Sequence, residues 1–402
     1  MIVQPVIAFD VAKGVSKAQV FLDRGRPQGK SFDVRHTAEG FTALHQRLQE
    51  VETLTGTRPV AIFESTGHYH AMLSYFLETK GYGYVLLNPI VAHQAKGTSL
   101  RKVKTDAQDA YRLGELFYKE TFELHQPREA ATLNLRTLTR QHEAVTRLYV
   151  QTKLQFQTVL DQVFPAYRGV FGTLYSQVSL KVLLDFPTAD AVLAVPEAAL
   201  ADRIALHGPS RSARWAREKA HALVAAAQCD PFQKARVPSQ LFVLTMYVDL
   251  LTTYHEHLTA LEKQIGALAE MIPACQQVQT IPGIGKKIAA TIIAEIGEID
   301  RFSHPKKLAA FAGGDPRVFA SGKFTATFNK ITKRGSSTLR HALFMAVLCG
   351  LRKTGSQRLK AFYDQKRQDG KAHKVAVIAC INKLLHWIYA ILKRQEAFID
   401  VA

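Results

Sequence analysis

Short apolar segments separated by turn residues occupy the start of the chain, and their order limits the possible folds more than any other feature. Residues 3–9, 16–22 and 29–34 have the β-rich or alternating pattern that is typical of strands. The segments between them, Lys13-Gly14-Val15 and Gly25 to Gly29, are turn-like. We therefore expect three strands joined as hairpins.

Helical and extended patterns alternate in the segment that follows. The spacing of apolar residues predicts a helix over 36–51, a strand over 59–63, a helix over 69–80 and a strand over 82–87. A further helix should begin at Asp106 and end near Tyr118. Three strands, a helix, a strand, a helix, a strand and a helix is the order of a ribonuclease-H-like domain. We therefore predict an α/β, ribonuclease-H-like domain over residues 1–125.

Four acidic residues fall at chemically useful positions of this predicted domain. Asp10 follows the apolar run Val6 to Phe9, and Glu64 follows Val60 to Phe63. Asp106 and Asp109 are three residues apart, so they share one face of the last helix. Two divalent ions about 4 Å apart can bridge a scissile phosphate, and they need carboxylates from separate elements. We interpret the four acids together as Mg²⁺ ligands. Any one of them alone would more often be a solvated strand end or a helix cap.

The middle of the chain has helical patterns only. Residues 129–159 and 241–269 are long and amphipathic, and we expect them to form the two arms of an antiparallel coiled coil within residues 126–273. Between them, Pro187, Pro196 and Pro209 punctuate short helical segments, which predicts an inserted helical subdomain over about 180–229. The fold class is thus α/β plus all-α, with a mainly helical domain over residues 274–402.

Basic residues concentrate in the last third of the chain. The whole chain has a formal net charge of +18, and residues 281–402 contain 22 Lys and Arg against 8 Asp and Glu, an excess of 14. Such an excess is typical of proteins with a polyanionic partner. Within it, Pro282-Gly283-Ile284-Gly285 forms a turn that opens a helix and resembles a helix-hairpin-helix element, with Lys286 and Lys287 beside it. A plain helix–helix turn with solvated lysines is the alternative.

A loop serine offers a second kind of chemistry in this region. Ser321-Gly322 lies between Pro316 and the strand-like run Phe324 to Phe328, with Arg317 and Lys323 nearby in the sequence. A serine hydroxyl can attack phosphorus and hold a cleaved strand covalently, although a Ser-Gly step is more often only a turn. Downstream, residues 330–340 form a basic loop that we expect to open a helix over 341–351 and to grip a nucleic-acid backbone.

Together, these motifs resemble those of one family, the DEDD-type insertion-sequence transposases of the IS-one-ten group, which is related to the Piv site-specific DNA invertase. The resemblance rests on Ile7 to Lys13, Phe63 to Tyr69, Leu87 to Pro89, Lys104 to Ala110, Ile281 to Gly285, Phe311 to Gly313, Pro316, Ser321-Gly322 and Lys333 to Arg340. The chain departs from the family pattern at Ser65, where alanine is common, and at Gly314-Asp315, where a more apolar pair is usual.

What the resemblance implies is a DNA transposase or site-specific recombinase. It implies that Asp10, Glu64, Asp106 and Asp109 bind Mg²⁺ and that Ser321 is the nucleophile that forms a phosphoserine intermediate. It also implies a homo-oligomer (dimer or tetramer) and a bridge RNA, a non-coding guide that pairs with donor and target DNA. The residues that we expect to contact nucleic acid are Lys104, Gly283, Gly285, Lys286, Lys287, Arg317, Lys323, Lys333, Arg334 and Arg340.

Two alternatives remain open at this point. The chain could be a RuvC-like nuclease in which metal-activated water attacks and Ser321 is only a loop residue, or a non-catalytic nucleic-acid-binding protein derived from such an enzyme.

The apolar run Ala376 to Leu392 is broken by Lys383 and His386, and the N-terminus lacks a basic flank. We therefore expect no membrane partner and a cytoplasmic location. Four scattered cysteines without CxxC spacing argue against zinc, and we expect buried thiols.

Overall fold

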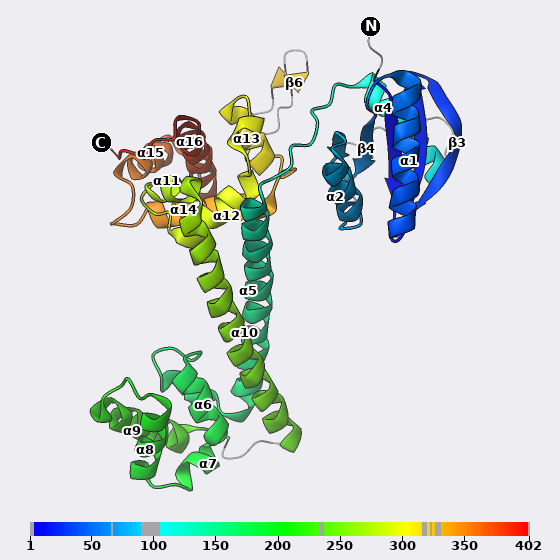
Figure 1. Cartoon of the computed structure of the whole chain (residues 1–402). Helices are drawn as coiled ribbons and strands as arrows, with labels where there is room; N and C mark the ends of the chain where they lie inside the picture. The colour runs from blue at the N-terminus through cyan, green and yellow to red at the C-terminus, as the bar shows by residue number, and fades with distance from the viewer. Residues whose placement is uncertain are drawn as a thin grey trace. The chain divides into compact units, whose positions relative to one another are not determined.

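The computed structural model describes residues 4–65, 67–89, 105–232, 237–315, 320–321, 324–325 and 331–400. The chain divides into two compact units, Met1–Pro127 and Arg128–Ala402. Figure 1 shows the elements of each. The first unit is a mixed α/β domain and the second is almost entirely helical. This division between an α/β part and a helical part was predicted from the sequence.

A five-stranded mixed sheet forms the centre of the first unit. Its order is β3 (Arg26–Arg35), β2 (Val15–Asp23), β1 (Val6–Val11), β4 (Val60–Glu64) and β5 (Tyr84–Leu87). Strands β1, β2 and β3 pair antiparallel as hairpins, whereas β4 runs parallel to both β1 and β5. The predicted strands and hairpins are confirmed.

Helices cover both faces of this sheet because the strand residues alternate between two apolar clusters. Ile7 and Phe9 of β1 pack with buried leucines of α1 (Ala38–Thr55) and α2 (His70–Lys80). Val6 and Ala8 instead pack with Leu113 and Leu116 of α4 (Asp106–Lys119). The side chains of every second residue of β1, beginning with Val6 and Ala8, therefore lie on the face of the sheet that α4 covers.

Two long helices, α5 (Ala130–Val163) and α10 (Pro238–Met271), pack against each other in the second unit (Figure 1). They are antiparallel, because the start of α5 shares a core with the end of α10 at one end, while the end of α5 shares a core with the start of α10 at the other.

Shorter helices pack at each end of this pair. The core at the end of α5 includes η1 (Pro165–Gly169), α6 (Gln177–Asp185), α7 (Ala189–Leu193), α8 (Glu197–His207) and α9 (Ala213–Cys229). The other end carries α11 (Pro273–Gln279), α12 (Lys286–Ile296), η2 (Ile299–Arg301), α13 (Pro305–Ala312), β6 (Ala320–Ser321), β7 (Phe324–Thr325), α14 (Ser337–Gly350), α15 (Gln357–Gln368) and α16 (His373–Arg394).

Helix α16 is long and apolar enough by composition to cross a membrane, although the sequence shows charged interruptions. Half of its most apolar window is buried inside the helical unit. Residues such as Cys380, Ile381 and Leu385 lie in the same core as α12 and α14. This burial is what a core helix requires, so composition alone gives little reason to place α16 in a membrane.

Two local predictions were inaccurate. Helix α14 begins at Ser337, earlier than predicted, because the Ser336 side chain accepts a hydrogen bond from Leu339 N and caps the helix. Residues 337–340 are thus helical and do not belong to a basic loop. Phe324–Thr325 form strand β7 as predicted, and the rest of the predicted strand, 326–328, lies outside the described residues. Among the cysteines, Cys275 and Cys380 are buried as expected, but Cys229 is exposed.

Candidate functional site

Asp10 and Glu64 are neighbours on adjacent parallel strands. The register pairs Val6 with Val60 and Ala8 with Ile62, so the next residues on the same face are Asp10 and Glu64. Val6, Ala8, Val60 and Ile62 all pack toward α4. Side-chain alternation therefore places both carboxylates on the α4 side of the sheet, where each is partly exposed.

Helix α4 brings Asp109 to this same side of the sheet. Asp109 lies one turn before Leu113, which packs on the sheet, and only 5% of Asp109 is exposed. Thr105 caps the helix by accepting a hydrogen bond from Gln108 N at 3.2 Å. Arg112 Nη1 lies 3.5 Å from Asp109 Oδ1. Asp106, at the first position of the helix, is exposed.

The four acids are thus on one side of the sheet, but the structure does not gather them into one metal centre. Within the described ranges, no group of three or more His, Cys, Asp or Glu side chains is close enough to hold a metal ion. The donor set itself suits a hard divalent cation, since all four ligands would be carboxylate oxygens. The burial of Asp109 also fits, because a buried carboxylate is normally compensated by a cation or a hydrogen-bond donor.

The segment around the candidate nucleophile is held at its base by backbone hydrogen bonds. Ser336 N donates to Phe311 O at 2.8 Å, and Lys333 N donates to Gly313 O at 3.2 Å. Ser321 pairs with Phe324 in the short β6–β7 ladder. The structure describes only the backbone of Ser321. Three predicted contact residues, Lys104, Arg317 and Lys323, lie outside the described residues.

The side chains of Arg340, Lys333 and Arg334 differ in exposure and in hydrogen bonding. Arg340 Nη1 donates to Ala312 O at 2.9 Å, so it ties α14 to the end of α13. Lys333 and Arg334 are exposed. Lys333 adopts the left-handed backbone conformation, with φ of 55°. Of these three predicted nucleic-acid contacts, the two exposed cations are therefore the more available to a phosphate backbone.

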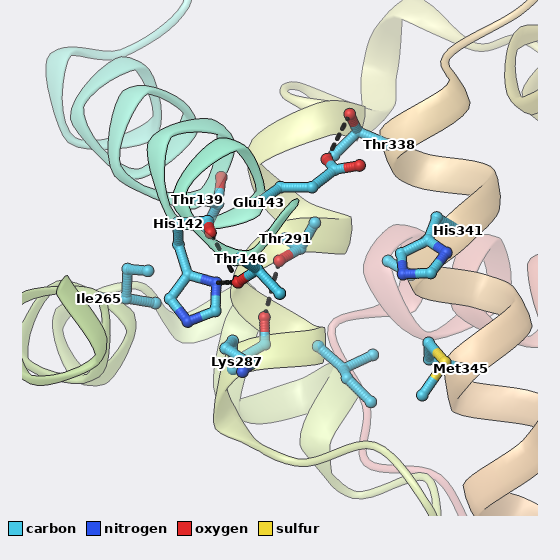
Figure 2. A pocket seen from close by; sticks show the side chains of 12 residues that line it. Thr139, His142, Glu143, Thr146, Ile265, Lys287, Thr291, Thr338, His341 and Met345 are labelled. Carbon is cyan, nitrogen blue, oxygen red and sulfur yellow. Dashed lines mark hydrogen bonds between the residues drawn. The ribbon is translucent and has the colours of Figure 1, made fainter. Parts of the chain in front are cut away.

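Lys286 and Lys287 face carboxylates of α10. Lys286 Nζ lies 2.6 Å from Glu270 Oε1, and Lys287 Nζ lies 2.9 Å from Glu262 Oε1. The hydrogen bond from Lys287 lowers the pKa of Glu262 below its usual value. Figure 2 shows Lys287 near His142 on the wall of a cavity of about 310 Å³ where α5, α10, α12 and α14 meet. Contact of these lysines with phosphate stays a prediction.

The two glycines before these lysines have different surroundings. A side chain at Gly283 would lie 2.4 Å from Gly350 N, and the φ of Gly283 is +95°. Gly285 caps α12, and no atom lies within 4 Å of the position a side chain would take. Gly283 is thus needed for close packing of the turn against the end of α14, whereas Gly285 leaves the start of α12 open.

The sequence reading missed Glu295, a carboxylate with no exposed surface. Ser336 Oγ donates to Glu295 Oε2 at 2.8 Å, and Arg140 binds both carboxylate oxygens through Nε at 2.7 Å and Nη2 at 3.1 Å. An acid inside the apolar run Thr291 to Ile296 was the available signal. A buried charge in such a run requires partners from elsewhere in the chain.

Comparisons with known proteins match the chain to transposases and to a gene-inverting protein. Residues 7–165 match a family model described as "Transposase", and residues 275–364 match one described as "Transposase IS116/IS110/IS902 family". The chain is 24% identical to the pilin gene-inverting protein of Moraxella bovis, over 98% of this chain and 97% of that protein. It is 33% identical to the transposase for insertion sequence element IS1111A of Coxiella burnetii, over 31% of this chain and 34% of that protein. An uncharacterised 42 kDa protein of insertion element IS900 of Mycobacterium paratuberculosis is 24% identical, over 82% of this chain and 81% of that protein.

Proposed function

This chain belongs to the IS110 family of DEDD transposases and recombinases, and we propose that it cuts and rejoins DNA strands with divalent metal at its N-terminal acids and Ser321 as the nucleophile. The observation that supports this most is the position of Asp10 beside Glu64, on the side of the sheet against which α4 packs the buried Asp109.

The finer architecture belongs to the same proposal. Residues 1–125 would be a RuvC-like catalytic domain, residues 126–273 coiled-coil arms with a helical subdomain over about 180–229, and residues 274–402 the transposase domain. The strand order supports the first part. The antiparallel packing of α5 and α10 supports the second.

Asp10, Glu64, Asp106 and Asp109 would hold the metal, which we propose to be Mg²⁺. When bound, a pair of such ions stabilises the charge on the attacking and leaving oxygens of a phosphodiester. The protein's own part is to place the carboxylates: two on the ends of neighbouring strands and two on the first turn of one helix. Asp106 is exposed at the first turn of α4, so its carboxylate would be open to a metal that the other three acids hold.

Ser321 would carry the covalent step. Its Oγ forms a bond to phosphorus, the bridging P–O bond of the strand breaks, and the leaving hydroxyl takes up a proton. The serine hydroxyl gives up its proton to solvent as the Oγ–P bond forms, and the leaving oxygen takes its proton from solvent. In the reverse step, the hydroxyl of the second strand attacks the phosphoserine and restores a phosphodiester, so no external energy source is needed.

Partners follow from the family and from the charge. DNA is the substrate, both as donor and as target, and the excess of 14 positive charges over residues 281–402 favours polyanion binding. We propose a homo-oligomer, a non-coding bridge RNA that selects the DNA, and action in the cytoplasm. The pilin gene-inverting protein named above indicates that relatives of this chain invert DNA segments, which is the same class of strand exchange.

A metal-dependent nuclease is the second candidate. The observation that favours it is the set of carboxylates, which suits hydrolysis by metal-activated water as well as serine attack. In that case Ser321 would be only a turn residue.

The test is to mix purified protein, Mg²⁺, labelled element-end DNA and RNA from the flanking region, and to look for protein-linked DNA on a denaturing gel. Ser321→Ala should abolish the adduct, whereas Ser337→Ala, an exposed serine of α14, should not. Asp10→Asn should lower strand cleavage by at least about 100-fold. Cut DNA with free ends and no adduct in any variant would favour the nuclease.

A further inference from the structure

Four arginines surround the buried carboxylate of Glu295 where α5 meets the end of α12. Arg128 donates to Ala294 O and Glu295 O at 3.3 and 3.2 Å. Arg140 binds Glu295 bidentately, and Arg136 Nε lies 3.6 Å from Glu295 Oε1. Arg301 interacts with Glu295 and Arg136 through its charge. We propose that this arginine cluster, Arg128, Arg136, Arg140 and Arg301, binds a phosphodiester of a nucleic-acid backbone. This deepens the proposed function by naming a contact for its polyanionic partner.

The cluster has more positive charge than its acids can neutralise. Glu295 interacts with Arg128, Arg136, Arg140 and Arg301, and Glu143 interacts with Arg140. Thr338 also donates to Glu143 at 2.9 Å. Four guanidinium groups against two carboxylates leave an excess of two charges. Like charges held close together need a further anion to lower their mutual repulsion.

Arg136 and Arg301 are the least satisfied members. Arg136 Nε and Arg301 Nε and Nη2 are buried and make no hydrogen bond with the described residues, and the ion pair of Arg136 Nε with Glu295 Oε1 is long at 3.6 Å. Arg301 instead stacks 4.5 Å over the rings of both Phe302 and Phe311. Stacking fixes the guanidinium plane but supplies no acceptor oxygen. Burial, followed by the neighbouring arginine charges, lowers the pKa of both Arg136 and Arg301.

Among the described residues, Glu295 and Glu143 are the carboxylates whose charge acts on these arginines. The segments beyond the described residues, which include 316–319, 322–323 and 326–330, contain no Asp or Glu and add Arg317, Lys323 and Lys330. These segments are therefore basic in composition. An anion from outside the chain would balance the positive excess of the cluster.

A phosphate can reach the outer nitrogen atoms of the cluster. The side chain of Arg136 is 32% exposed and that of Arg140 is 50% exposed. A phosphodiester presents two oxygens to a guanidinium in the geometry that a carboxylate also uses. Glu295 and Ser336 connect this cluster to the segment that carries the exposed Lys333 and Arg334. One nucleic-acid backbone could therefore contact both places.

The test measures nucleic-acid binding at several salt concentrations without metal, by fluorescence anisotropy. The probes are a labelled duplex DNA and a labelled single-stranded RNA. Arg136→Gln and Arg301→Gln should each weaken binding about tenfold at low salt. Each lost contact should also lower the slope of log affinity against log salt by about 0.9 for the duplex or about 0.7 for the single strand. The probe that loses affinity identifies the source of the phosphate.

Arg203→Gln is the matched control, because Arg203 is 49% exposed and pairs with Asp185 in the distant helical subdomain. It should leave the slope unchanged. Arg136→Lys keeps the charge, so it should keep the slope even where its bidentate contact weakens. If both glutamine variants match Arg203→Gln on both probes, or if Arg136→Lys loses as much slope as Arg136→Gln, the proposal is wrong. The absence of metal separates this result from any failure of Asp10 or Ser321 chemistry.

Discussion

Glu295 illustrates how one residue can hold several elements together. Burial alone raises the pKa of Glu295, but the hydrogen bond and charge of Arg140, with Arg136 and Ser336, outweigh burial and lower it. Glu295→Gln should therefore destabilise the protein by about 3 kcal/mol, because it leaves buried arginines without their carboxylate. The measurement is the free energy of unfolding by chemical denaturation. Glu298→Gln, an exposed acid nearby, should change it by less than about 0.5 kcal/mol.

The same residue predicts a pH dependence with a definite sign. Since the folded pKa of Glu295 is lowered, its stabilisation is complete above the usual glutamate pKa of 4.5 and is lost as the pH falls through the lower folded value. Wild-type stability should thus fall more steeply than that of Glu295→Gln below about pH 4.5. Parallel pH profiles of the two proteins would show that this ion pair does not contribute.

At the scale of elements, the two glycines of the turn before α12 have different roles: Gly283 packs against the end of α14, and Gly285 leaves the start of α12 open. Gly283→Ala should cost about 2–4 kcal/mol, because its Cβ would clash with Gly350 and its φ of +95° strains any other residue. Gly285→Ser should be tolerated or add a few tenths of a kcal/mol, since serine is a good N-cap and the position is open. Equal stability losses in thermal unfolding would contradict this.

The sequence predicted most elements because each depends on a local pattern. The short apolar runs of β1 and β4 predicted the strands, and the order of elements put Asp10 and Glu64 at comparable strand positions. Long-range pairing was not predictable in this way. Lys286 and Lys287 look like phosphate ligands in the sequence, yet Glu270 and Glu262 lie 16 and 25 residues away and become their partners only when α10 packs on α12. The cluster around Glu295 depends on similarly distant residues.

At the scale of the whole molecule, the pair of long helices leaves apolar side chains without cover. Phe242, Met246 and Leu250 of α10 are 73%, 42% and 36% exposed, and their spacing of four places them along one face. On α5, Leu148 and Leu154 are 48% and 63% exposed. Exposed apolar stripes of this kind are typical of contact surfaces. We expect a second copy of the chain to cover the exposed apolar residues of α5 and α10.

Two substitutions test that expectation at the level of assembly. Phe242→Glu with Met246→Glu should raise the dissociation constant of the oligomer by more than about tenfold, since each buried apolar side chain contributes about 1.5–3 kcal/mol. Sedimentation of the protein across a concentration series measures this directly. Leu206→Glu, a leucine of α8 with 65% exposure, is the control and should leave the association unchanged. If the double variant associates like the wild type, the oligomer does not form through the exposed apolar face of α5 and α10. The two helices would then be held together only by their contacts with each other.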